Sequence, residues 1–123
     1  MEPNYVANFR LEQVIDGSTF VGLLDYGLDV LIRKKIRLVN VKCHTPDVPQ
    51  GADAKIFVLK LLAGKTIHCR TFRDKWRKWN TILAVMYVKD AGGGWINLND
   101  VLIEREFATR DNGHGDDSEN PVH

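Results

Sequence analysis

The first forty residues alternate apolar and polar positions in the manner of β-strands. Residues 5–15 follow a period of two, and residues 19–24 and 29–41 are rich in Val, Ile and Leu. Tyr26 and Gly27 separate the last two stretches and predict a hairpin turn between them. This part of the chain therefore predicts three strands, the second and third of which form a hairpin.

The pattern changes at residue 52, where apolar residues begin to recur at spacings of three and four. This spacing predicts a helix over residues 52–62 that ends before Gly64. The apolar stripe consists of Ala54, Phe57, Val58, Leu61 and Leu62. Residues 44–51 contain two prolines and a glycine and predict a loop.

The second half of the chain predicts more strands and a second helix. Residues 66–72 and 82–88 are apolar enough for strands, with a polar loop at 73–80 between them. Three glycines at 92–94 predict a turn, and Asn99 is expected to cap a short helix that runs to about residue 106.

This order of elements predicts an α+β fold. We expect a five-stranded OB-type β-barrel with one helix after the third strand and a short helix near the C-terminus. The length of 123 residues fits a single domain, which we expect to cover residues 1–108. Residues 109–123 are polar and acidic, and we expect them to form a disordered tail.

The charge is distributed unevenly, although the net charge is only +1. Residues 33–78 hold thirteen Lys or Arg against three acids, a net of +10, and the rest of the chain carries −9. A segment of this kind binds polyanions if it folds onto one face, and is otherwise a set of solvated basic positions.

Composition also bears on location. No apolar run approaches the roughly 18 residues that a membrane span needs, and no signal-peptide pattern begins the chain. Cys43 and Cys69 are the two cysteines. These features predict reduced thiols, a cytoplasmic location and no association with a membrane.

The loop at 73–80 interleaves tryptophans with cations. Aromatic rings stack on bases and cations hold phosphates, so this mixture predicts a grip on single-stranded nucleic acid. The other interpretation is that one of the tryptophans closes an end of the barrel. The cluster consists of Arg73, Lys75, Trp76, Arg77, Lys78 and Trp79.

Six segments follow one family's motifs in order. They are VIDGSTF at 14–20, IRLVNVKC at 36–43, TPD at 45–47, GADAKIFVLKLLAGKTIHCRTF at 51–72, LAVMYV at 83–88 and NLNDVLIEREFA at 97–108. Together they resemble the staphylococcal nuclease (thermonuclease) family over residues 5 to 108. The resemblance implies an OB-type barrel with a calcium-dependent nuclease site.

In that family two carboxylates and a main-chain carbonyl bind calcium, two arginines stabilise phosphoryl charge and a glutamate activates water. By this resemblance Arg37 falls at the first arginine, and Asp16 matches an aspartate beside the site. Ser18 and Lys42 replace the two carboxylates that bind calcium. Because calcium binding depends on the number of charged oxygen ligands, the resemblance implies a vestigial metal site with no calcium.

Two further positions are ambiguous in this alignment. The glutamate falls on Thr45 without a gap, or on Asp47 with a two-residue insertion. The second arginine falls on Thr81 if the strand sets the register, or on Arg77 if the loop does; strand spacing is the firmer guide.

Three of these residues also have purely structural interpretations. Arg37 would pair with an acid of the barrel, and Asp16 would bond the backbone of its own turn. Lys42 would be a solvated residue at a strand end.

The sequence therefore predicts an inactive nuclease-like module without a cofactor. It would bind single-stranded DNA or RNA, or a protein partner, through Arg37, Lys42, Arg73, Lys75, Trp76, Arg77, Lys78 and Trp79. One alternative is a divergent calcium-dependent phosphodiesterase that uses Arg37, Asp47 and Arg77, with a metal held by Asp16 and main-chain oxygens. Another is a phage or mobile-element protein that acts through protein–protein contacts.

Overall fold

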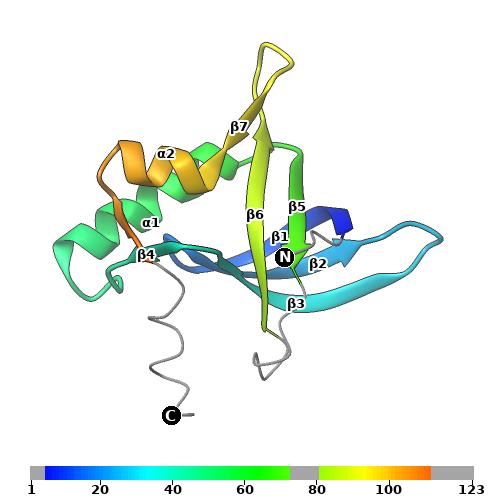
Figure 1. Cartoon of the computed structure of the whole chain (residues 1–123), viewed down its shortest axis with the longest axis horizontal. Coiled ribbons are helices and arrows are strands. Elements are labelled where there is room, and N and C mark those ends of the chain that lie inside the picture. Colours follow the sequence, from blue (N-terminus) through cyan, green and yellow to red (C-terminus); the bar gives the residue numbers. More distant parts are fainter. Residues whose placement is uncertain (1–4, 73–80, 112–123) are drawn as a thin grey trace.

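A computed structural model describes residues 5–72 and 81–111 of the chain (Figure 1). Its helices are α1 (Pro49–Leu62) and α2 (Leu98–Glu104). Its strands are β1 (Tyr5–Asp16), β2 (Thr19–Asp25), β3 (Leu31–Leu38), β4 (Val41–Cys43), β5 (Ile67–Phe72), β6 (Thr81–Lys89), β7 (Trp95–Asn97) and β8 (Ala108–Arg110).

Five strands close into a mixed β-barrel. The sheet order is β3-β2-β1-β5-β6-β7, and β3 also pairs with β6 in parallel, which joins the two sides of the sheet. The register of the closing pair runs from Lys35 opposite Thr81 to Leu38 opposite Ala84. This arrangement confirms the predicted α+β barrel, with one helix after its third strand and a short one near the C-terminus.

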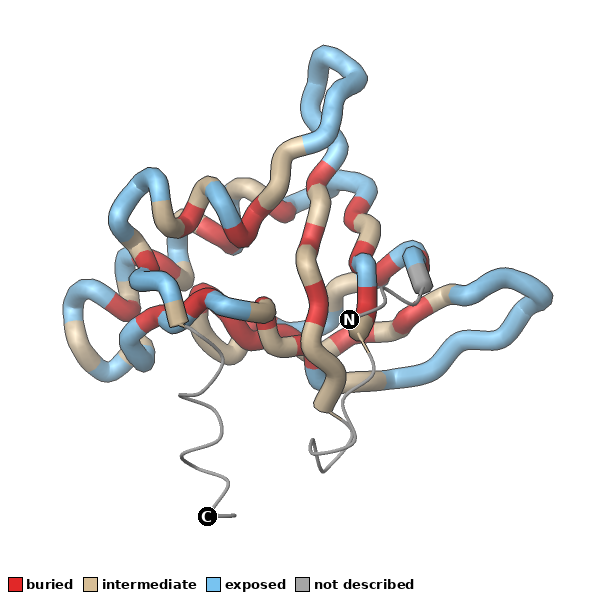
Figure 2. The backbone as a smooth tube through the Cα atoms, viewed as in Figure 1, coloured by how far each residue is buried: buried red, intermediate tan, exposed pale blue. Residues whose placement is uncertain are grey.

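The core lies inside the barrel and follows the period of two that the sequence shows (Figure 2). Phe20 and Leu24 on β2 and Ile36 on β3 have no exposed surface. Helix α1 contributes Ala54 and Val58 to the same core, one turn apart on its inner face.

Helix α1 begins three residues earlier than the apolar stripe predicts, at Pro49. Proline suits a first helical position because its φ is fixed near the helical value and its missing N–H would have no intrahelical partner there. Gly51 then has no room for a side chain, since an added Cβ would lie 1.8 Å from the Thr45 carbonyl oxygen.

The single strand expected over residues 29–41 is in fact two strands. Asn40 has a φ of +61°, a left-handed conformation that asparagine tolerates better than most residues. The chain turns there, so that β3 ends at Leu38 and the short β4 starts at Val41. The buried positions change phase across this turn, from Ile36 and Leu38 on β3 to Val41 and Cys43 on β4, and this shift by one residue marks the break in the sequence.

The expected cap of the second helix is also wrong. Asn97 caps α2, since its Oδ1 accepts from the Asp100 N–H at 3.1 Å. Asn99 is instead buried, and its Oδ1 accepts from the Met86 N–H at 3.1 Å. Its Nδ2 donates to the carbonyl oxygen of Val39 at 3.0 Å. Asn99 thereby joins β6 to the turn before β4.

The boundary expected after Ala108 falls inside a strand. Thr109 and Arg110 continue β8 and pair with Lys42 and Val41 of β4. Such short strands are set by pairing with another segment and leave no period in the sequence. The rest of the expected tail, residues 112–123, lies outside the described residues, as does the loop at 73–80. Neither α1 nor α2 is long and apolar enough to cross a membrane.

Candidate functional site

The turn between β1 and β2 holds the residues that match the nuclease hairpin. The Oδ1 atom of Asp16 accepts from the Ser18 backbone N–H at 2.7 Å and from the Ser18 hydroxyl at 3.1 Å. Ser18 is 1% exposed, and its carbonyl oxygen accepts from the Leu38 N–H at 2.9 Å. One carboxylate oxygen of Asp16 therefore closes the turn, and the turn is attached to the end of β3.

Cys43 of β4 packs directly against this turn. A Cβ added at Gly17 would lie 2.8 Å from the Cys43 sulfur, so only glycine allows the two segments to approach this closely. Burial, and after it the negative charge of Asp16, raises the pKa of the Cys43 thiol to about 11. A hydrogen bond with Ser18 and the positive charge of Arg37 oppose this shift. The thiol is therefore neutral at physiological pH and is a poor nucleophile and metal ligand.

Arg37 completes this group, which we call the nuclease-like pocket: Asp16, Ser18, Arg37, Cys43 and Asp111. The Nη2 atom of Arg37 lies 4.0 Å from Oδ2 of Asp111, and their side chains are 23% and 9% exposed. The Asp111 backbone N–H donates to the Asn40 carbonyl oxygen at 2.9 Å, which holds this carboxylate beside β3. The sequence did not indicate Asp111, because it lies in the segment expected to be disordered.

The other residues proposed from the sequence are more dispersed. Lys42 is exposed and lies opposite Thr109 in the register of β4 and β8. The Thr45 hydroxyl donates to Asp47 in the exposed loop before α1. Thr81 lies opposite Lys35, two positions before the residue that faces Arg37. Arg73, Lys75, Trp76, Arg77, Lys78 and Trp79 lie outside the described residues.

The donor atoms at this place do not fit calcium. Ca²⁺ takes six to eight oxygen ligands, carboxylates above all. Asp16 uses Oδ1 within its own turn, Ser18 offers a hydroxyl that donates to that same atom, and Lys42 brings a positive charge. Within residues 5–72 and 81–111, no three His, Cys, Asp or Glu side chains gather in a way that could hold a metal ion.

Strand β3 presents a row of cations on its outer face. Ile36 and Leu38 point into the core, so Arg33, Lys35 and Arg37 share the opposite face at a spacing of about 6.6 Å. Arg33 donates two hydrogen bonds of 2.8 Å to the Glu12 carboxylate, which lowers the pKa of Glu12. Lys35 is exposed at the centre of the row.

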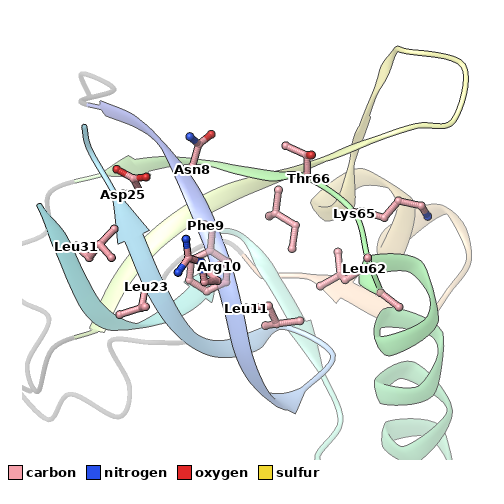
Figure 3. Close-up of a pocket in the computed structure, with 13 residues that line it drawn as sticks. Asn8, Phe9, Arg10, Leu11, Leu23, Asp25, Leu31, Leu62, Lys65 and Thr66 are labelled. Atoms are coloured by element: carbon pink, nitrogen blue, oxygen red, sulfur yellow. The ribbon is translucent and has the colours of Figure 1, made fainter. Parts of the chain in front are cut away.

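A pocket of about 630 Å³ opens elsewhere, between the outer face of β1 to β3 and the segment that follows α1 (Figure 3). Arg10, Asp25 and Lys65 supply its charged groups, and leucines supply much of the remaining wall. None of the residues proposed from the sequence lines it.

The structure also brings together aromatic residues that the sequence reasoning missed. The rings of His68 on β5 and Trp95 on β7 stack with centroids 4.4 Å apart, and Lys89 Nζ lies 4.8 Å from the Trp95 ring centroid. The positions of these residues within their strands put them on one face, but their contact depends on the order of the strands in the sheet.

Comparison with protein-family models finds no match for this chain, and comparison with curated proteins finds none.

Proposed function

We propose that this barrel is a non-catalytic module that binds single-stranded DNA or RNA. The observation that supports the proposal most directly is the row of Arg33, Lys35 and Arg37 on the outer face of β3. Cations repeated along an extended strand are well placed to contact successive phosphates of an extended nucleic acid. Lys42, on the next strand along the chain, would add to this basic surface.

The absence of catalysis in this proposal follows from the nuclease-like pocket. Hydrolysis in the nuclease family needs a dication and carboxylates, whereas here the corresponding positions hold Ser18 and Lys42. Arg37 lies beside the Asp111 carboxylate, and the Cys43 thiol is neutral. A staphylococcal nuclease-like origin of the barrel is supported by the closed five-stranded fold and by the motif residues Asp16, Gly17 and Arg37, which lie at the β1–β2 turn and on the neighbouring β3. Two buried cysteines without a disulfide fit a reducing, cytoplasmic setting.

The salt dependence of binding tests this proposal. Three phosphate contacts predict that log K falls with log salt at a slope of about −2, so affinity for a labelled single strand should fall about 100-fold between 50 and 500 mM salt. Replacing Lys35 by glutamine should reduce the slope by about 0.7. Lys60→Gln on α1 is the matched control, since it removes an exposed charge away from β3. Equal binding at both salt concentrations would contradict the proposal.

The same samples distinguish the alternatives. Incubation of the labelled strand with 10 mM calcium or a chelator should give retardation without cleavage. Cleavage that requires calcium would establish the phosphodiesterase instead. No retardation and no cleavage would favour a protein that acts through a protein partner.

A further inference from the structure

The outer face of β5, β6 and β7 combines aromatic rings with cations. Because residues opposite each other in a sheet point to the same side, His68, Tyr87 and Asn97 lie in one row, and Lys89 and Trp95 in the next. We call this surface the aromatic face. Its outward positions in the described strands are His68, Arg70, Phe72, Thr81, Leu83, Val85, Tyr87, Lys89, Trp95 and Asn97.

Trp95 reaches across a neighbouring strand on this face. Strand β6 lies between β5 and β7, so His68 and Trp95 are attached to backbones about 9.6 Å apart. Their ring centroids are nevertheless 4.4 Å apart with an interplanar angle of 30°, so the rings meet over β6. Lys89 contacts the same indole at 4.8 Å. These contacts hold the indole in one place before a ligand arrives, which lowers the entropy cost of binding.

The indole still offers surface to a ligand. Trp95 is 43% exposed although it touches both His68 and Lys89. Val6, on the adjacent β1 and opposite Arg70, is 61% exposed and extends the apolar part of the face. Exposed aromatic and apolar groups of this kind, set in a polar surround, are typical of binding sites.

The charges on this face have one sign. Arg70 and Lys89 are exposed, and the outward positions of β5, β6 and β7 that the structure describes contain no Asp or Glu. A ligand that combines flat rings with negative charges complements such a face, and an unpaired nucleotide is a ligand of this kind.

The aromatic face is continuous with the cations of β3. Leu83 on β6 lies opposite Arg37, and Lys89 is six residues farther along the same face of β6, a distance of about 20 Å. A single strand whose phosphates contact β3 would therefore meet Tyr87, His68 and Trp95 if it continued along β6.

We propose that the aromatic face is a base-binding site, in which an unpaired base of a single-stranded nucleic acid stacks on Trp95 while Arg70 and Lys89 contact its phosphates. This inference rests on the proposed function, because it adds base contacts to the phosphate contacts of β3.

The test compares two labelled twelve-nucleotide strands by fluorescence anisotropy, one of thymidines and one with the same phosphates but abasic sites. Trp95→Ala should weaken binding of the thymidine strand about tenfold and change binding of the abasic strand less than twofold. Trp95→Phe keeps a ring and should stay within about threefold of the wild type. Leu59→Ala on α1 removes a side chain of similar exposure, 44%, and should change neither affinity.

The outcomes separate this inference from the proposed function. If the wild-type protein binds both strands and Trp95→Ala changes neither affinity, the base-binding site is refuted and the β3 site stands. If Trp95→Ala weakens both strands equally, the tryptophan acts on the fold and the inference is again refuted. If the wild type binds neither strand, both proposals fail.

Discussion

The nuclease-like pocket and the aromatic face differ in how their charges are balanced: the pocket contains charges of both signs, and the described charges of the aromatic face are all positive. In the pocket, Asp16 accepts two hydrogen bonds from Ser18, and Arg37 lies beside Asp111. On the aromatic face, Arg70 and Lys89 share their side of β5, β6 and β7 with no described acid. In the region that resembles an enzyme in sequence, the charges of the functional side chains are thus balanced by other groups of the same chain. The region that carries no motif keeps the net charge and the exposed aromatic surface that a ligand needs.

The largest expected effect comes from Asn99, which bonds the inner side of β6 to the turn between β3 and β4. Asn99→Ala would remove the bonds to Met86 and Val39 and leave buried backbone groups without partners, at a cost of about 3 kcal/mol of unfolding free energy. Urea denaturation measures this loss. Asn97→Ala is the matched control, since loss of the helix cap should cost only about 1 kcal/mol. Equal losses in the two variants would show that the buried hydrogen bonds of Asn99 stabilise the fold no more than a helix cap does.

Asn99 also shows how far the sequence predicts this fold. The period of two predicted the barrel strands, and the spacing of three and four predicted α1. Burial on one face of a strand or helix imposes these periods on the sequence directly. The choice between Asn97 and Asn99 as the helix cap is different. Either residue can cap a helix, and which one is buried depends on where β6 and Val39 lie.

The candidate sites were predictable to different degrees. The motifs placed Asp16, Ser18 and Arg37 close together, because the strand pairing of a hairpin is local. Asp111 was missed because its contact with Arg37 spans 74 positions and depends on the three-residue strands β4 and β8. The stack of His68 on Trp95 was missed for a similar reason, since it requires β6 to lie between two strands that are distant in sequence.

The pH dependence of stability tests whether the pocket keeps Cys43 neutral. The ordinary thiol pKa is 9.0, and the folded value is about 11. Below pH 9 the thiol is neutral in both states, so its contribution to stability is fully present. As the pH rises through 11 the unfolded chain loses its proton first, and about 2 to 3 kcal/mol of stability is lost.

Urea denaturation from pH 8 to 11 measures this loss, with Cys43→Ala as the comparison. The decline should be shallower in the variant, because it lacks the Cys43 thiol. The other titratable groups, including the buried Cys69, are present in both proteins, so their contributions to the pH dependence cancel. Parallel curves would mean that the thiol has the same pKa in the folded and unfolded chains, so that the pocket does not raise it.

Carboxylates placed at the two positions that the nuclease resemblance assigns to calcium ligands test that assignment. Ser18→Asp combined with Lys42→Asp supplies the charged oxygen ligands that calcium prefers. With a dissociation constant near 1 mM, 10 mM calcium would stabilise the double variant by about 1.4 kcal/mol, seen as a rise in Tm. The uncharged pair Ser18→Asn and Lys42→Asn should show no rise. If the two double variants respond alike, the assignment of these positions to the metal site is wrong.

The smallest expected effect comes from Asp111, whose removal would make the pocket more like the aromatic face. Asp111→Asn keeps the shape of the side chain but removes the negative charge 4.0 Å from Arg37. A phosphate would then meet no competing carboxylate at that guanidinium, and single strands should bind two- to fivefold more tightly. The salt slope should change little, because Arg37 is already one of the three phosphate contacts on β3. Glu104→Gln on α2 controls for net charge, since it removes an exposed acid that has no part in the pocket. If Asp111→Asn and Glu104→Gln bind alike, overall charge governs affinity, and the internal compensation of the pocket has no bearing on binding.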